Sequence, residues 1–403
     1  MSQPSKLLVI STSIPHPTLG ANAVALFQYM KCFCDAGYKI LHIALLKQGT
    51  FDEDDLKQYV SDFSSEHFQI HALTVPGFYK SGRSILQSLE PIDVPLPTRE
   101  VMQQFSPDLF VCFDIAAAGF WSTFNNRTKT LVWLGDLNFQ VSWYKALYAA
   151  KERWIDVLSI PLAWIESQKW KSFYKKVLAS VHRIIVTAKS SEKELQRFGI
   201  ESRYLAYAWP ELPSASTSPL RPTKPTFVFF GHLSGLGSRS ALHFLFEELY
   251  PKLLTIWGVN GFSIVICGTS TLPLWAESKI ARFSEISSVG FVDDLGALLH
   301  SSHAAIIPID IPVGNRTRII TAMALGVPVI AHSNTALGNP SLVDGQTCYL
   351  AKDAAGFVER MKRAYECPDE VQSIVKRARA VYDTEYSPTV ACPAMLQELE
   401  RLS

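Results

Sequence analysis

Two glycine turns that carry arginine are the segments of this chain best suited to bind a phosphate. The first runs from Gly231 to Arg239 and the second from Gly314 to Arg318. Glycine turns expose backbone N–H groups, and the planar guanidinium group of arginine matches phosphate oxygens. Arg316 and Arg318 alternate, so they can point in different directions, and one of them can serve only to pair with a surface carboxylate. The pattern predicts an anion-binding site.

Each turn lies between a predicted strand and a predicted helix. The apolar runs 227–230 and 304–308 predict short buried strands, and helical patterns follow at 241–254 and 319–325. Strands that alternate with helices predict a parallel sheet with helices on both faces. Ligands of such sheets bind at the carboxyl ends of the strands. Both turns are therefore expected at the ligand-binding edge of an α/β domain.

The first half of the chain repeats this pattern. Residues 7–11 and 39–45 predict strands, and 23–36 predicts the helix between them. Gly20 precedes this helix, where it either serves only the turn or also lets the backbone approach a ligand. We favour the second interpretation, because Gly20 lies at a strand-to-helix junction.

Asp136 follows another predicted strand, 130–134, near its carboxyl end. Carboxylates in this position are often catalytic, but an aspartate there can equally cap the helix that follows. The sequence alone leaves both roles open.

A proline-rich segment, 210–225, separates the two halves and is typical of a linker. The sequence thus predicts four parts: an N-terminal domain over 1–212, a linker over 213–225, a C-terminal domain over 226–386 and a last helix, 387–403, that packs back on the N-terminal domain.

The segment 143–183 mixes aromatic residues with lysine and arginine, and Pro161 divides it into two predicted helices. Helices of this composition can lie on anionic membranes. They can also be ordinary core helices with solvated lysines, so both interpretations stay open.

Composition excludes several classes of protein. The chain has 403 residues, of which 48% are hydrophobic, and a formal net charge of +1, so neither wholesale disorder nor nucleic-acid binding is expected. The seven cysteines are scattered without a CxxC pair, as expected of reduced thiols in a cytosolic protein. No signal peptide and no apolar stretch of about 20 residues is evident. We expect a cytoplasmic protein, either free or peripheral at the inner membrane face.

The second half resembles the donor domain of the GT-B glycosyltransferases, and specifically the retaining family 4 of glycosyl transferases group 1. The resemblance rests on the order and spacing of several fragments: 229–233, 247–251, 264–268, 289–295, 304–308 and 314–330. The first half is similar only loosely, through the Gly20 turn and the strand end at 133–136.

The resemblance implies an α/β fold of two facing Rossmann-like, doubly wound domains with an interdomain cleft. A nucleotide-diphosphate sugar would bind the C-terminal domain, and a hydroxyl acceptor would bind the N-terminal domain. The base would lie along the backbone at Phe291 and Val292. The diphosphate would lie near the following residues: Gly231, His232, Ser234, Arg239, Gly314, Asn315, Arg316, Thr317 and Arg318.

Enzymes of this family usually need no metal, because arginine, lysine and a helix N-terminus stabilise the leaving nucleotide. The chain agrees in having no DxD pair beside a strand, and the resemblance implies no other cofactor. We interpret the adjacent Asp293 and Asp294 as a helix cap. Arg318 aligns with the basic position of the family motif, so it is the preferred catalytic arginine.

The family retains the anomeric configuration, and the resemblance implies attack on the front face of the sugar while the leaving phosphate helps to take the acceptor's proton. Asp136 is the first candidate to orient the acceptor hydroxyl, and His16 is the second. The product would be a polysaccharide, a glycolipid or a glycosylated natural product.

The chain departs from the family at both glutamates of its ExxxxxxxE motif. Val313 and Thr321 stand at these positions, and Thr321 can make only one neutral hydrogen bond to the ribose. His332 and Asn334 could partly replace the lost contacts. The missing glutamates also favour a catalytically degenerate GT-B subunit that binds a partner. A sugar-nucleotide epimerase of the same shape is a third alternative, although it would need several acids and bases.

Overall fold

The computed structural model describes residues 5–18, 20–49, 53–63, 67–81, 87–124, 128–212, 222–269 and 271–402. These residues form two compact units. The first takes residues from Met1–Ala146, Ile155–Pro210 and Pro388–Ser403, and the second takes them from Leu147–Trp154 and Glu211–Ser387. Most of the predicted linker, 213–221, lies outside the described residues.

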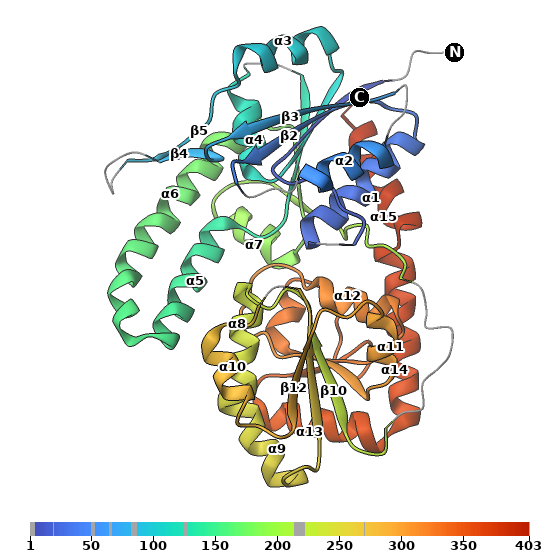
Figure 1. Ribbon diagram of the computed structural model, residues 1–403. Helices are drawn as coiled ribbons and strands as arrows, with labels where there is room; N and C mark the ends of the chain where they lie inside the picture. Colours follow the sequence, from blue (N-terminus) through green and yellow to red (C-terminus); the bar gives the residue numbers. More distant parts are fainter. Residues whose placement is uncertain are drawn as a thin grey trace. The chain divides into compact units, whose positions relative to one another are not determined.

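The first unit is built on a seven-stranded parallel sheet in the order β3-β2-β1-β6-β7-β8-β9 (Figure 1). Its strands are β1 (Lys6–Ser11), β2 (Lys39–Lys47), β3 (Phe68–Val75), β6 (Leu109–Phe113), β7 (Lys129–Leu134), β8 (Arg183–Val186) and β9 (Arg203–Tyr204). A separate antiparallel pair consists of β4 (Tyr79–Ser81) and β5 (Leu89–Pro91). The central strands are apolar on both faces, as parallel strands between two helical layers must be.

The helices that begin in or return to this unit are α1 (Ala21–Asp35), α2 (Glu53–Asp62), α3 (Leu96–Phe105), α4 (Ile115–Ser122), α5 (Asn138–Glu152), α6 (Ile160–Leu178), α7 (Lys189–Arg197) and α15 (Pro388–Glu400). A 3₁₀ turn, η1 (Trp154–Ser159), joins α5 to α6. The predicted pair of helices is thus present. However, Pro161 stands in the first turn of α6, where its missing N–H costs nothing, and the break between the helices comes earlier.

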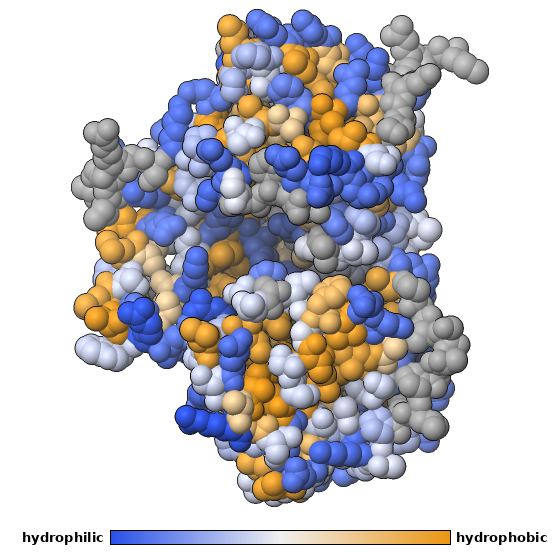
Figure 2. Space-filling view, viewed as in Figure 1, coloured by the Kyte–Doolittle hydropathy of each residue, from blue (hydrophilic) through white to orange (hydrophobic). Residues whose placement is uncertain are grey.

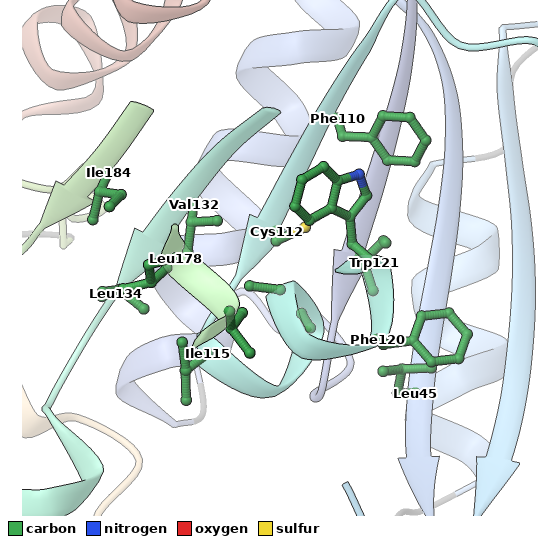
Figure 3. Close-up of a cluster of buried hydrophobic side chains, with 14 of the residues drawn as sticks. Leu45, Phe110, Cys112, Ile115, Phe120, Trp121, Val132, Leu134, Leu178 and Ile184 are labelled. Atoms are coloured by element: carbon green, nitrogen blue, oxygen red, sulfur yellow. The ribbon is translucent and has the colours of Figure 1, made fainter. Parts of the chain in front are cut away.

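Side chains that alternate along the strands fill the core of the first unit. Figure 3 shows Phe110 and Cys112 of β6 on the side of the sheet where Trp121 of α4 packs. On the opposite face, Phe113 contacts the ring of Tyr29 from α1, with the ring centroids 5.9 Å apart. Each face therefore has its own helical cover.

The last helix, α15, is held in the first unit by a buried carboxylate. Glu398 is only 1% exposed, and it contacts Arg183 at 3.0 Å and Arg203 at 2.6 Å. Arg183 is the first residue of β8 and Arg203 is the first residue of β9, so these ion pairs attach α15 to the edge of the N-terminal sheet.

The second unit contains a six-stranded parallel sheet in the order β12-β11-β10-β13-β14-β15. Its strands are β10 (Thr226–Phe230), β11 (Ser263–Cys267), β12 (Ile286–Gly290), β13 (Ala304–Ile307), β14 (Val329–His332) and β15 (Tyr349–Ala351). Its helices are α8 (Leu236–His243), η2 (Phe244–Leu249), α9 (Tyr250–Trp257), α10 (Leu274–Ile280), α11 (Leu295–His300), α12 (Thr317–Ala324), η3 (Ser333–Leu337), α13 (Ala354–Glu366), α14 (Pro368–Val381) and η4 (Tyr382–Tyr386). The strand order reverses beside β10 and β13, and both arginine-bearing turns follow these two strands.

Across the described ranges, no helix is both long and apolar enough to cross a membrane.

Candidate active site

The turn after β10 can only be made by glycine. Gly231 has a φ of +118°, and a Cβ atom added there would lie 2.3 Å from Nε of Arg318. Gly268, at the end of the neighbouring strand β11, has a φ of +151°, and its Cβ would lie 1.7 Å from the carbonyl oxygen of Gly231. A side chain at either position would therefore collide with its neighbours. Because neither glycine has a side chain, the backbone of this turn lies directly against the guanidinium group of Arg318.

Arg318 stands in the first turn of α12 and reaches across to the loop between β10 and α8. Its Nη2 atom donates to the carbonyl oxygen of His232 at 3.1 Å and to Oγ of Ser238 at 2.5 Å. Ser238 is buried, and its hydroxyl donates to the same His232 carbonyl at 2.5 Å. The guanidinium also lies over the ring of Phe229, 5.1 Å from its centroid. These contacts fix the guanidinium in one position.

The surroundings of Arg318 favour an anion. Burial, with a contribution from Arg316, lowers the pKa of Arg318, which means that the charged form lacks its usual stabilisation. Among the described residues, no carboxylate pairs with Arg318. The N-terminal ends of α8 and α12 adjoin the same loops, and neither N-cap residue, Gly235 or Arg316, caps its helix with a side chain. A phosphate would supply the negative charge that this site lacks.

The second turn is held by its own hydrogen bonds. Gly314 has a φ of +71°, and Oδ1 of Asn315 accepts from the backbone N–H of Arg316 at 2.7 Å. Nη2 of Arg316 donates to the carbonyl oxygen of Ile311 at 2.8 Å. Arg316 thus braces the loop, and Thr317 begins α12 directly after it.

Arg239 is placed differently from Arg318. Its guanidinium makes a two-pronged ion pair with Glu152 of α5, with Nε and Oε1 at 2.7 Å. The Nε2 atom of His243 lies 3.4 Å from the same carboxylate. Arg239 is therefore paired with a carboxylate. Of these two arginines, only Arg318 lies against the glycine turn at Gly231.

The positions of the two missing glutamates are both buried. Val313 is 3% exposed and Thr321 is 6% exposed. His332 uses both ring nitrogens inside the unit: Nε2 donates to the carbonyl oxygen of Lys352 at 3.0 Å, and Nδ1 accepts from the N–H of Asn334 at 3.2 Å. Burial lowers the pKa of His332, which agrees with this neutral form. The side-chain amide of Asn334 donates to the carbonyl oxygen of Asp310 at 2.5 Å.

The predicted base-binding residues directly follow β12. Phe291 is 62% exposed and follows Gly290, whose φ is +71°. Val292 is half-buried. Asp294 caps α11 by accepting from the N–H of Ala297 at 2.8 Å, which confirms the interpretation of that aspartate as a helix cap.

Residues 224–367 match the family model described as glycosyl transferases group 1. This unit is a glycosyl transferases group 1 domain. No curated protein matches the chain. Among solved structures, sucrose-phosphate synthase from Thermosynechococcus elongatus is similar at 15% identity, with 99% of each chain covered and a TM-score of 0.71. Anabaena HepE in complex with UDP and glucose is similar at 14% identity, with 98% of this chain and 99% of that chain covered and a TM-score of 0.68.

A TarM variant from S. aureus, solved in complex with UDP among other ligands, is similar at 10% identity, with 99% of each chain covered and a TM-score of 0.67. These likenesses span both Rossmann-like units, so the fold is that of the GT-B glycosyltransferases. With the group 1 domain, the chain is a glycosyltransferase.

In the N-terminal unit of this glycosyltransferase, the three predicted residues lie after two of its strands. Asp136 is exposed two residues after β7 and two before α5. His16 lies in the loop after β1, where its Nδ1 atom accepts from the N–H of Thr18 at 3.1 Å. Gly20, with a φ of +78°, is the residue before α1. All three therefore belong to loops at the carboxyl ends of parallel strands.

One further carboxylate lies at this edge, and the sequence analysis missed it. Asp114 follows β6 with a φ of +91°, which is rare for a residue other than glycine. It accepts from Ala116 N–H at 2.8 Å, from Ala117 N–H at 2.9 Å and from the hydroxyl of Thr12. Burial raises its pKa to about 6. The sequence contains one feature that could have revealed this residue, because Asp114 stands between a predicted buried strand and an alanine-rich segment that begins a helix.

Asp114 stands where the order of the N-terminal sheet reverses. Strands β1 and β6 are neighbours, while the chain leaves β1 toward β2 on the other side. Ligands of open α/β sheets bind at such switch points. Asp114 and Thr12 thus mark the ligand-binding edge of this unit.

The second unit also contains a cavity of about 420 Å³ on the side of α8 and α10. Its walls include the carboxylates of Glu152, Glu247, Glu248 and Asp310, together with His243 stacked on Trp275. None of the predicted donor residues lines this cavity. Lys151 and Lys279 line it as well, and Lys279 is paired with Glu247.

Proposed function

We propose that this glycosyltransferase moves a sugar from a nucleotide-diphosphate sugar to a hydroxyl group, with retention of the anomeric configuration and without a metal. The observation that supports the proposal most strongly is the guanidinium of Arg318, which is held against Gly231 without a carboxylate partner among the described residues. A diphosphate in this position would also meet the N-terminal ends of α8 and α12.

The proposed mechanism depends on where negative charge develops during sugar transfer. As the bond between the sugar and the phosphate breaks, negative charge grows on the leaving phosphate oxygen. Fixed donors at that point lower the barrier, because they need no reorganisation when the charge appears. The acceptor hydroxyl attacks the anomeric carbon from the same face, and its proton passes to the leaving phosphate. No nucleophile from the enzyme is required on this route.

The nucleotide of this proposal is a uridine diphosphate. Support comes from HepE, which was solved with UDP, with UDP and glucose, and with UDP-glucose. The exposed ring of Phe291 offers the base an apolar surface beside the backbone of Val292. Thr321 would give the ribose one neutral hydrogen bond where the family motif supplies a carboxylate, so donor affinity would be modest.

The acceptor is a hydroxyl compound bound by the N-terminal unit. We assign its orientation to Asp136 first and to His16 second, with Asp114 and Thr12 as the partly buried support behind this edge. The products would be polysaccharides, glycolipids or glycosylated natural products made in the cytoplasm.

A thermal-shift series with UDP-, GDP-, ADP- and TDP-sugars tests the donor. A ligand that binds only the native state raises the unfolding midpoint by mass action, so UDP-sugars should give the largest increase. NMR of the product then tests retention through the anomeric coupling. A larger shift with another nucleotide would remove the assignment to uridine, and an inverted product would remove the front-face route.

A second candidate function is a catalytically degenerate subunit that binds a partner. Val313 and Thr321 in place of the two family glutamates favour it. The two functions differ in one measurement, because a degenerate subunit would bind UDP without releasing it from a UDP-sugar, whereas the enzyme would turn the donor over by transfer or slow hydrolysis.

A further inference from the structure

A histidine stands in the middle of a buried and otherwise apolar strand of the first unit. From Ile40 to Leu46, every residue of β2 is buried, and His42 is the one polar side chain among them. An imidazole among apolar side chains is unfavourable unless its nitrogens have hydrogen-bond partners, and an apolar residue would avoid this penalty. The hydrogen bonds of His42 are therefore the reason to ask what this residue does.

Both ring nitrogens of His42 have a partner from another element. Nδ1 lies 2.7 Å from the hydroxyl oxygen of Tyr59 in α2, and Nε2 lies 2.9 Å from Oγ of Ser11, the last residue of β1. The Ser11 hydroxyl donates to the carbonyl oxygen of Ser13 at 2.7 Å. We call these three side chains and the Ser13 carbonyl the His42 network. It is a buried connection from α2 to the loop after β1.

The hydrogen bonds of the His42 network all run in one direction. The single proton of the Ser11 hydroxyl is donated to the Ser13 carbonyl, so Oγ accepts from Nε2–H of His42. Nδ1 then carries no proton and accepts from the Tyr59 hydroxyl. Burial lowers the pKa of His42 to about 3, so the ring is neutral and keeps this arrangement at physiological pH.

The far end of the network is held by packing on the inner side of α2. Figure 2 shows hydrophilic side chains over the exposed face of this helix, whereas Tyr59 is 1% exposed. Its ring contacts those of His42, Phe63 and Phe68, with the centroids 5.1–5.7 Å apart. The network therefore starts from a hydroxyl group that neighbouring aromatic rings already fix in place.

The near end of the network is the loop 12–18, which contains His16 and Thr12. Thr12 donates to Asp114, which follows β6, while the carbonyl of Ser13 is held through β2. Strands β2 and β6 are the two neighbours of β1 in the sheet, on opposite sides of it. The start of this loop is thus anchored from both sides, and the His42 network supplies the anchor on the β2 side.

We propose that His42 is a positioning residue for the acceptor site, which acts through Ser11 to hold the loop 12–18 in place before the acceptor binds. This inference rests on the proposed function, in which the N-terminal unit binds the acceptor hydroxyl. A loop that is already ordered loses less conformational entropy when its ligand arrives, so it binds that ligand more tightly. Loss of the network should weaken acceptor binding and leave the donor site in the second unit unaffected.

The test compares His42→Leu, Ser11→Ala and the double variant with wild type, all as full-length proteins. Thr130→Val is the matched control, because Thr130 is also fully buried in this sheet and its hydroxyl donates to a carbonyl two residues away, that of Thr128 at 2.9 Å. Thr130 lies near the start of β7, and the carboxyl ends of the strands carry the loop. All variants remove one buried hydrogen bond or one network.

Hydrogen–deuterium exchange followed by mass spectrometry reports the order of the loop without any ligand. We expect the amides of 12–18 to exchange about fivefold faster in His42→Leu and Ser11→Ala, and at the wild-type rate in Thr130→Val. The double variant should exchange no faster than about twice either single variant, since both changes break the same network. Unchanged exchange in His42→Leu, or fold-changes that multiply in the double variant, would overturn the proposal.

Kinetics with a UDP-sugar and methyl glycosides as hydroxyl acceptors separate positioning from folding. We expect the KM for the glycoside to rise about fivefold in His42→Leu and Ser11→Ala, while hydrolysis of the UDP-sugar without acceptor stays within about twofold of wild type. A residue that only stabilises the fold would lower the unfolding midpoint and leave this KM unchanged, which would overturn the proposal. If wild type turns over no UDP-sugar, the proposed function fails, and the exchange measurement still decides whether His42 holds the loop.

Discussion

Nη2 of Arg318 lies 2.5 Å from Oγ of Ser238, a buried side chain 80 positions earlier in the chain. Ser238 in turn donates to the carbonyl oxygen of His232, which also accepts from Arg318. This triangle ties the first turn of α12 to the loop after β10. These three hydrogen bonds hold the guanidinium group of Arg318 where a diphosphate is proposed to bind.

Replacing Ser238 by alanine should therefore loosen Arg318 without removing its charge. We expect the transfer rate to fall roughly tenfold, since small misplacements of a positioning group are costly in a preorganised site. Ser240→Ala is the matched control, because Ser240 is equally buried on the same helix but has the carbonyl oxygen of Gly237 and the side chain of Tyr148 as its described partners. Equal rates for the two variants would show that the triangle does not position Arg318.

A methyl group at Gly231 should displace Arg318 more strongly. The added Cβ would lie 2.3 Å from Nε, so we expect about a hundredfold loss of transfer rate in Gly231→Ala. Gly258→Ala is the control: Gly258 also has a positive φ, +74°, but nothing lies within 4 Å of its Cβ. Both variants carry backbone strain of about 1–3 kcal/mol, which chemical denaturation measures. If both lose activity alike, strain and not the clash explains the loss.

Asp114 should give the protein a distinct dependence of stability on pH. Its pKa is about 6 in the folded state and has an ordinary value of 3.8, because burial penalises the charged form. The folded state then holds a proton that the unfolded state releases, so the contribution of Asp114 to stability is full below pH 3.8 and is lost as pH rises to about 6.

Denaturant titrations across this range, on wild type and Asp114→Asn, check the effect. Asparagine can still accept from the N–H groups of Ala116 and Ala117 but does not titrate. We expect the difference in unfolding free energy between the two proteins to change between about pH 4 and pH 6 and to be constant above it. A constant difference throughout would contradict the raised pKa.

Metal chelation should leave the enzyme active. Within the described ranges, no group of three or more His, Cys, Asp or Glu side chains is arranged to hold a metal ion. The proposed mechanism assigns the stabilisation of the leaving phosphate to Arg318 and to helix N-termini instead. Transfer rates measured with EDTA and with added Mg²⁺ or Mn²⁺ should agree within about twofold. A strict requirement for a divalent ion would contradict the metal-independent mechanism.

The alternation of strands and helices was predictable because it depends on local sequence. The runs at 227–230 and 304–308, for example, correspond to β10 and β13, and the predicted cap at Asp294 is present. The two arginine-bearing turns were expected at one sheet edge. In the structure, Arg318 of the second turn lies against Gly231 of the first turn.

Long-range pairing could not be predicted in the same way. Glu152 and Arg239 are 87 positions apart, and nothing in either segment specifies that they form an ion pair. Asp114 was missed because its strained φ and its contact with Thr12, 102 positions away, exist only once β1 and β6 are adjacent. His332 was considered as a replacement ligand, but its ring nitrogens have fixed partners that the sequence does not reveal.

The transfer rate of Arg318→Ala tests the central claim most directly. Arg377→Ala is the matched control, since Arg377 lies in the same unit but binds Ser373 and the backbone at Gly345 and Gln346. Circular dichroism and thermal unfolding establish that both variants are folded. We predict a loss of about 10²–10³ in rate for Arg318→Ala and near wild-type turnover for Arg377→Ala. Normal turnover by a folded Arg318→Ala enzyme would contradict the assignment of the diphosphate site.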